Sequence, residues 1–112
     1  MKTLGELKPG DYIYVVYYAD EGDCILNVFK RVIRIITDIS TGKIIKWDAY
    51  KDSYLYDQYY GHTVRKDKYN DCIDNNHIFG RKICSDKNYV LDLIKKDRQK
   101  QMEKYDKILK SL

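Results

Sequence analysis

The sequence has few of the features that mark secreted, membrane-spanning or disulfide-stabilised proteins. Its three cysteines, Cys24, Cys72 and Cys84, are an odd number without the spacing of a disulfide framework, so we expect reduced thiols. The N-terminal residues lack the apolar core of a signal peptide. No hydrophobic run reaches the length of a membrane span. We therefore expect a soluble, cytoplasmic protein that has no membrane partner.

The motifs of the common enzyme and metal-binding classes are also missing. There is no Walker loop and no Gly-rich dinucleotide fingerprint, which excludes the common nucleotide enzymes at the level of motifs. Cys72, His77 and Cys84, with His62 upstream, match no zinc-binding spacing. No nucleophile elbow surrounds a cysteine, and residues 67–74 lack the Gly and Glu of a calcium loop. We expect no catalytic residue, metal or cofactor. An enzyme whose groups assemble from distant positions stays open as a third possibility.

Tyrosine is abundant and alanine is scarce. The chain has 12 tyrosines against two phenylalanines and one tryptophan, and tyrosine combines an apolar ring with a polar hydroxyl that suits contact surfaces. Lys, Ile, Asp, Asn and Tyr are frequent, whereas alanine occurs only at Ala19 and Ala49. This bias indicates an AT-rich coding genome, such as that of a bacterium or its phage.

The charge is modest and uneven. The net charge is +4, and residues 86–112 hold eight Lys or Arg against five Asp or Glu, so the first 85 residues are nearly neutral. A dedicated nucleic-acid binder usually carries a larger and more clustered excess of positive charge. A length of 112 residues with 44% hydrophobic and 34% charged residues is typical of one globular domain.

Three successive β-strands are predicted over residues 12–18, 24–37 and 43–50. The first carries β-branched or aromatic residues at nearly every position. Both of its faces are apolar, so we expect another element to cover one of them. In the second, the apolar face changes parity near Lys30 and Arg31, which predicts a bulge or a sharp bend there.

Residues 51–85 have a weaker pattern. Short strands are predicted at 54–56 and 62–65, with a tyrosine-rich loop at 57–61 between them. Residues 66–76 are polar and are predicted to form a loop with a turn at Asn75-Asn76. A final strand is predicted over 77–84.

The C-terminal region is predicted to be one long helix. Ser85-Asp86 is a suitable N-cap for a helix over residues 87–111. Its first turns are apolar, residues 95–101 are polar, and apolar residues with helical spacing return from Met102 to Leu112. We expect the first half to pack on the sheet, while the second half projects, bends back or pairs with a partner.

The stretch Leu7–Val15, which reads LKPGDYIYV, resembles the first strand of small SH3-like barrels. In those barrels a Gly-Asp turn precedes a β-branched strand, and a strongly bent meander follows. The resemblance covers about residues 7–50 and implies a five-stranded antiparallel barrel with an appended helix. It implies no activity, because such barrels bind proteins and nucleic acids alike. The expected fold class is mostly β (α+β), with residues 1–85 barrel-like and residues 86–112 a C-terminal α-helix of the same domain.

The leading functional expectation is a non-enzymatic protein-interaction module, of the kind a phage encodes as an accessory or virion protein. A tyrosine-rich segment and an apolar helical stripe without a catalytic constellation favour a protein partner or a homo-oligomer. The expected contact residues lie in these two segments: Tyr54, Tyr56, Tyr59, Tyr60, Met102, Tyr105, Ile108 and Leu109.

The alternative is a small β-barrel that binds nucleic acid. Basic and aromatic residues alternate on the second and third predicted strands, where bases could stack on rings while cations contact phosphates. The residues expected to do so are Arg31, Arg34, Lys46 and Trp47. A solvated strand face explains the same pattern, because aspartates interrupt it.

Overall fold

The computed structural model describes all residues except 1, 20–23, 50–57 and 79. The described residues form six strands, two short 3₁₀ helices and one α-helix in the following order: η1 (Leu4–Glu6), β1 (Tyr12–Tyr18), β2 (Ile25–Ile39), β3 (Gly42–Asp48), β4 (Tyr59–Arg65), η2 (Lys66–Lys68), β5 (Ile73–Ile78), β6 (Arg81–Cys84) and α1 (Lys87–Ser111). The strands make one antiparallel sheet in the order β4-β3-β2-β1-β6-β5. The expected fold class, a mostly β domain with a C-terminal helix, is confirmed.

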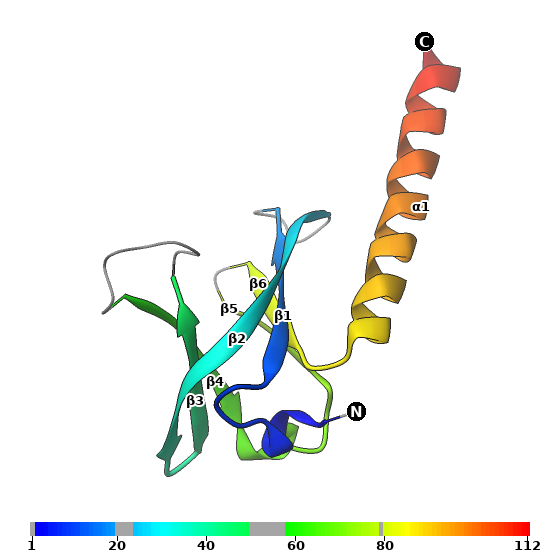
Figure 1. The fold of residues 1–112 in the computed structure, drawn as a ribbon. Helices are drawn as coiled ribbons and strands as arrows, with labels where there is room; N and C mark the ends of the chain where they lie inside the picture. The colour runs from blue at the N-terminus through cyan, green and yellow to red at the C-terminus, as the bar shows by residue number, and fades with distance from the viewer. Residues whose placement is uncertain (1, 20–23, 50–57, 79) are drawn as a thin grey trace.

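The sheet curls into a half-barrel because the long strand β2 is shared between two partners (Figure 1). Its first half pairs with β1, from Ile25 to Val32, and its second half pairs with β3, from Ile33 onward. The register shifts between Ile33 and Ile35, which leaves Arg34 as an extra residue. A bulge of this kind bends a strand and increases its twist. The sequence predicted a bulge or bend near Lys30-Arg31, and the observed bulge at Arg34 lies three residues further along the strand.

The region after residue 57 differs from its predicted structure in three places. Residues 59–61 belong to β4 rather than to a loop, because they pair with β3 along its whole length. Residues 73–76 belong to β5, so the expected turn at Asn75-Asn76 is wrong. Residues 77–78 end β5 and residues 81–84 form β6, so that the predicted single strand is two strands, and Gly80 between them has a φ of 71° that a glycine adopts readily. In each case pairing with a neighbouring strand overrides a polar or glycine-containing local sequence. The strand predicted at 54–56 lies outside the described residues.

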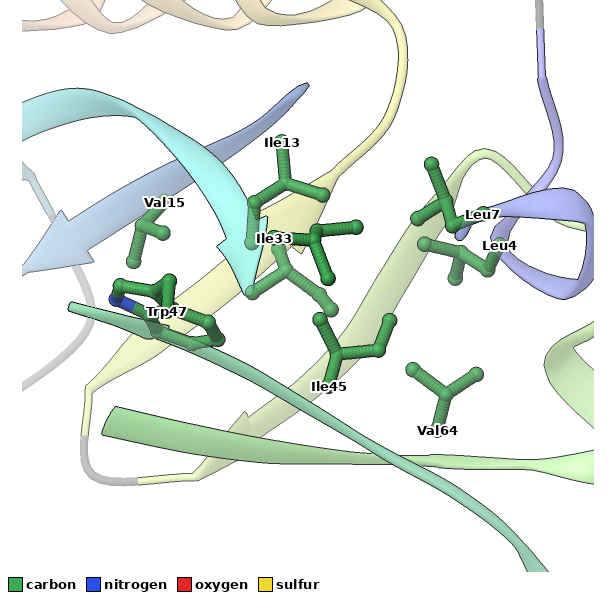
Figure 2. Close-up of a cluster of buried hydrophobic side chains, with 9 residues drawn as sticks. Leu4, Leu7, Ile13, Val15, Ile33, Ile45, Trp47 and Val64 are labelled. Carbon is green, nitrogen blue, oxygen red and sulfur yellow. The ribbon is translucent and has the colours of Figure 1, made fainter. Parts of the chain in front are cut away.

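The main core lies on the inner, concave face of the sheet. Figure 2 shows Ile13, Ile33 and Ile45 at its centre, with Leu4 and Leu7 toward one end and Trp47 toward the other. The 3₁₀ helix η1 holds Leu4 in place, because the Leu4 amide donates to the Asp71 carbonyl at 2.8 Å. The N-terminal segment thus closes one end of the half-barrel, and the end near Trp47 has no such cover among the described residues.

The first half of α1 packs on the outer face of the sheet over β1 and β6. Val90 is buried against Val16 and Cys84, and Leu93 packs at the edge of this second cluster. The helix begins at Asp86, whose carboxylate accepts a hydrogen bond from the Asn88 amide at 3.0 Å, as the sequence predicted. Both faces of β1 are therefore covered, as its residues indicated.

The second half of α1 extends past the sheet (Figure 1). Of the whole helix only Val90 is buried. The Cα radius of gyration is 16.1 Å, compared with about 13 Å for a compact domain of this length. The projecting helix accounts for the difference. The second half of α1 therefore does not bend back over the sheet, which was one of the three paths expected from the sequence.

Gly42 at the start of β3 provides a test of the close packing between β3 and β4. A Cβ atom there would overlap the carbonyl oxygen of Val64 and lie 2.9 Å from the Cα of Arg65, so Gly42→Ala requires a backbone shift. We expect it to lower the free energy of unfolding by about 1–3 kcal/mol in urea titrations. Gly61→Ala is the matched control, because its nearest neighbour would be the Ile44 side chain at an ordinary 3.5 Å. Equal stability of the two variants would contradict the close approach.

Candidate functional site

A pocket of 270 Å³ lies on the inner face at the Trp47 end of the core. Alternation along four neighbouring strands brings its walls together, because every second residue of a strand faces the same side. Four aromatic rings, one arginine and two small aliphatic side chains line it: Tyr17, Phe29, Trp47, Tyr60, Arg31, Val15 and Ala49. No acidic side chain is among them.

The rings of this pocket are packed against each other and against two guanidinium groups. Tyr17 and Phe29 meet edge to face with their centroids 5.5 Å apart. The Arg31 guanidinium lies 4.6 Å from the centroid of Phe29. The Arg81 guanidinium lies 5.3 Å from the centroid of Trp47 and 5.8 Å from that of Tyr60. The two cations are attracted to the electron-rich faces of the rings, and they make the surroundings of the pocket positive.

Next to the aromatic walls, side chains join the two edge strands of the sheet. His62 on β4 and Asp74 on β5 are both buried, and the His62 Nε2 lies 2.7 Å from the Asp74 Oδ2. Arg81 on β6 donates to the Gly61 carbonyl on β4. Within the described residues no backbone ladder connects β4 to β5. Polar side chains therefore close the half-barrel where the backbone does not.

Burial lowers the pKa of His62, and the nearby positive charge of Arg81 lowers it further, although the hydrogen bond to Asp74 acts in the opposite direction. The imidazole of His62 is therefore neutral at neutral pH, and its Nε2–H donates to the Asp74 Oδ2. The Nδ1 atom of His62 is buried and has no hydrogen-bond partner among the described residues. A base this enclosed does not reach a substrate, so the arrangement is suited to holding strands together.

The described cysteines do not form a nucleophilic or metal-binding centre. Burial raises the pKa of Cys84 to about 12, so its thiol is protonated at neutral pH and is a poor nucleophile. The Cys72 sulfur lies 3.8 Å from the Lys2 carbonyl oxygen, and His62 contacts Asp74 instead of a cysteine. Among the residues that the structure describes, no group of three or more His, Cys, Asp or Glu side chains could hold a metal ion.

The four residues expected to bind nucleic acid divide between the two faces of the sheet. Arg31 and Trp47 line the pocket together. Lys46 and Asp48 flank Trp47 along β3 and therefore point to the opposite, outer face. Arg34 joins this outer group, since its Nε donates to Asp48 at 3.0 Å. The structure thus brings one pair of the predicted residues together and separates it from the other.

The residues expected to contact a protein also divide. Tyr59 and Tyr60 lie on the edge strand β4, where they are 37% and 40% exposed, and only Tyr60 lines the pocket. Tyr54 and Tyr56 lie outside the described residues. The four expected helix residues, Met102, Tyr105, Ile108 and Leu109, are all exposed. They form a continuous apolar stripe on the projecting half of α1.

Sequence reasoning missed three contributors to the pocket and its surroundings. Tyr17, Phe29 and Arg81 received no functional role, although Tyr17 has the same parity as Ile13 and Val15, and Phe29 has that of Arg31 and Ile33. Following these parities across the strand pairs would have placed both rings on the inner face. Arg81 gave no signal, because the β5–β6 hairpin was not predicted.

None of the helices in the described part of the chain combines the length and the apolar character needed to cross a membrane.

The state of His62 predicts how stability depends on pH. Because its folded pKa lies below the unfolded value of 6.5, the unfolded chain takes up a proton first as the pH falls. The contribution of His62 to the free energy of unfolding is therefore fully present above pH 6.5. As the pH falls from 6.5 to the folded pKa, this contribution is lost by up to about 1.4 kcal/mol per pH unit. Urea unfolding of the wild type should show this loss between pH 7 and pH 5.

His62→Gln is the matched variant, because glutamine retains an N–H for Asp74 and does not titrate. Its stability should change less than that of the wild type over the same pH range. His77 is present in both proteins and cancels in the comparison. The lowered pKa values of the exposed Glu6, Asp11 and Asp67 carboxyl groups act below about pH 4.5. Identical pH profiles for the two proteins would show that His62 is not the titrating group.

Comparisons of the chain with protein-family models, with curated proteins and with solved structures found no match.

Proposed function

We propose that the protein is a non-enzymatic protein-interaction module that binds its partner through the apolar face of α1. One observation supports this above all: a helix of 25 residues has a single buried residue, while large apolar side chains along it are exposed. A surface helix normally buries its apolar stripe, and a helix gains most of its stability from such packing. The projecting half of α1 lacks it within the described chain.

The exposed stripe has the width and the spacing of a helix-pairing surface. At about 100° per residue, its members fall within an arc of about 120°. They are Leu91, Ile94, Met102, Tyr105, Ile108, Leu109 and Leu112, all of them exposed. Five of the seven recur at alternating steps of three and four residues, which is the heptad pattern of paired helices. Arg98 and Gln101 occupy the two central positions of the same pattern.

We infer that the partner is α1 of a second copy in the antiparallel orientation. A parallel pair would place Arg98 of one copy against Arg98 of the other, where like charges repel. An antiparallel pair places Arg98 opposite Gln101, Leu91 opposite Ile108, and Ile94 opposite Tyr105. Each of these matches occurs twice by symmetry. The polar central layer then specifies the register.

Charge complementarity supports the same register. In the antiparallel pair Asp97 of one copy flanks the seam opposite Lys104 of the other, again twice. Asp97 accepts a hydrogen bond from the Ile25 amide at 3.3 Å, which positions its carboxylate at the start of the exposed half of the helix. A carboxylate has further lone pairs for a cation. In a parallel pair Asp97 would face Met102 of the other copy and Lys104 would face Leu109, so that neither residue would form an ion pair.

The closed interior supports the non-enzymatic part of the proposal. The hydrogen-bonded His62–Asp74 pair is buried, and the Cys84 thiol is buried and, because its pKa is raised to about 12, protonated at neutral pH. General acid–base catalysis requires a group within hydrogen-bond reach of the substrate. Among the described residues, these groups, which most resemble catalytic ones, are thus enclosed in the interior.

Light scattering coupled to size-exclusion chromatography tests the pairing directly. The wild type should elute as a dimer at about 0.1 mM protein, and Ile108→Asp should elute as a monomer. Burial of one isoleucine contributes roughly 1.5–3 kcal/mol, and each dimer loses two of them and gains two buried charges. A monomeric wild type at that concentration would overturn the proposal of a second copy.

Lys104→Glu tests the register. It places a negative charge opposite Asp97 and should weaken dimerisation, more so at low salt than at high salt. Lys107→Glu makes the same change of net charge on the opposite side of the helix and should leave the dimer intact. If both variants weakened the dimer equally, the antiparallel register would be wrong.

A further inference from the structure

The pocket near Trp47 is independent of the helix surface and has a chemistry of its own. Four rings line it, and guanidinium groups contact three of them: Arg31 lies over Phe29, and Arg81 over Trp47 and Tyr60. We propose that this pocket binds a nucleobase that carries a phosphate. The base comes either from a free nucleotide or from one unit of a single-stranded nucleic acid, and the phosphate contacts Arg31.

The positive charge of the two guanidinium groups argues against an ammonium ligand, which is the other common ligand of an aromatic pocket. Rings without nearby cations attract ammonium groups such as methyl-lysine or choline. Here two guanidinium groups already lie against the ring faces, and none of the described residues that line the pocket carries a carboxylate. A cationic ligand would be repelled, whereas an anionic or neutral one would not. The ligand is therefore flat and apolar on its faces and negative at its edge.

Unlike Arg34 and Arg65, Arg31 has no acidic partner within the described residues. Arg34 pairs with Asp48 at 3.0 Å, and Arg65 pairs with Asp67 at 2.6 Å. The Arg31 Nη1 donates to the neighbouring Lys30 carbonyl at 3.2 Å, and no other hydrogen bond joins its guanidinium to a described residue, so further N–H groups can bind an oxyanion. A guanidinium fork matches the oxygens of a phosphate.

The volume of the pocket is suited to a ligand with a single ring system, such as one base. Its 270 Å³ lies just below the roughly 300–1,000 Å³ of pockets that enclose drug-sized ligands. Trp47 is 1% exposed and serves as a wall, whereas Tyr60 is 40% exposed and has ring area available for stacking. Stacking on aromatic side chains is tolerant of base identity. The proposal thus predicts recognition of a base with little sequence preference.

Trp47 is the single tryptophan of the chain, so its fluorescence reports on this pocket alone. We would titrate the wild type with adenosine, with adenosine monophosphate, and with an oligothymidylate of about eight nucleotides. Free tryptophan serves as the control for absorption by the ligand. We expect the monophosphate to quench Trp47 at concentrations at least fivefold lower than the nucleoside, because it adds a charge-assisted contact.

Arg31→Gln should remove the difference between nucleotide and nucleoside, and it should weaken nucleotide binding by about tenfold. Arg34→Gln is the matched control on the outer face and should change neither. Tyr60→Ala should weaken both ligands by about fivefold or more, because it removes a stacking surface. Tyr59→Ala, at the adjacent position of the same strand, should have no such effect.

Two outcomes distinguish the source of the ligand, and two would overturn the proposal. Equal affinity for monophosphate and oligonucleotide would identify the free nucleotide as the ligand. Tighter binding of the oligonucleotide, with a salt slope of about −0.7 per phosphate contact, would identify the single strand. The proposal fails if Trp47 responds to neither ligand. It also fails if Arg31→Gln and Arg34→Gln weaken binding equally, which would indicate diffuse attraction by a basic surface.

Discussion

The buried hydrogen bond between His62 and Asp74 is the contact on which the shape of this domain depends. These residues lie on β4 and β5, the two edges of the sheet, and the 2.7 Å contact joins edges that no described backbone ladder connects. A buried polar pair is stabilising only when its partners are present together. The half-barrel therefore requires both residues at once, and so do the pocket and the core between these strands. Arg81 reinforces the closure through the Gly61 carbonyl and stacks on the pocket walls.

The two ends of the half-barrel have different roles because they are closed by different elements. At one end the N-terminal segment inserts Leu4 and Leu7 and bonds to the chain near Tyr69 and Asp71. At the other end the core finishes at Trp47, and the space beyond it is lined by rings and by Arg31. A hydrophobic core needs cover on every side to exclude water. Among the described residues this end has no such cover, and it is here that the proposed ligand would take the place of protein.

Much of the fold was predictable from local pattern, and the parts that were not depend on contacts distant in sequence. The dense β-branched pattern of 12–18 and the Asp86 cap made β1 and α1 predictable to within a residue or two. Strand β5 could not be predicted, because its polar sequence resembles a loop and its strand structure comes from pairing with β6. The pocket was predictable only in part: residue type placed Trp47 and Arg31 among the nucleic-acid candidates, but bringing them together required the curl of the sheet. His62 and Asp74 were each considered alone, because nothing in the sequence indicates that residues twelve apart meet in the interior.

Net charge was a poor guide to the chemistry of the pocket. The first 85 residues are nearly neutral, and on that ground nucleic-acid binding took second place. The structure distributes those charges unequally: Asp48 and Asp67 neutralise arginines outside the pocket, whereas Arg31 and Arg81 lie at the pocket, whose described lining residues include no acidic side chain. A local field depends on which side of the sheet each charge occupies, since a low-dielectric layer and the intervening distance separate the two faces. A chain can therefore be neutral on average and still present a cationic, aromatic surface on one face of its sheet.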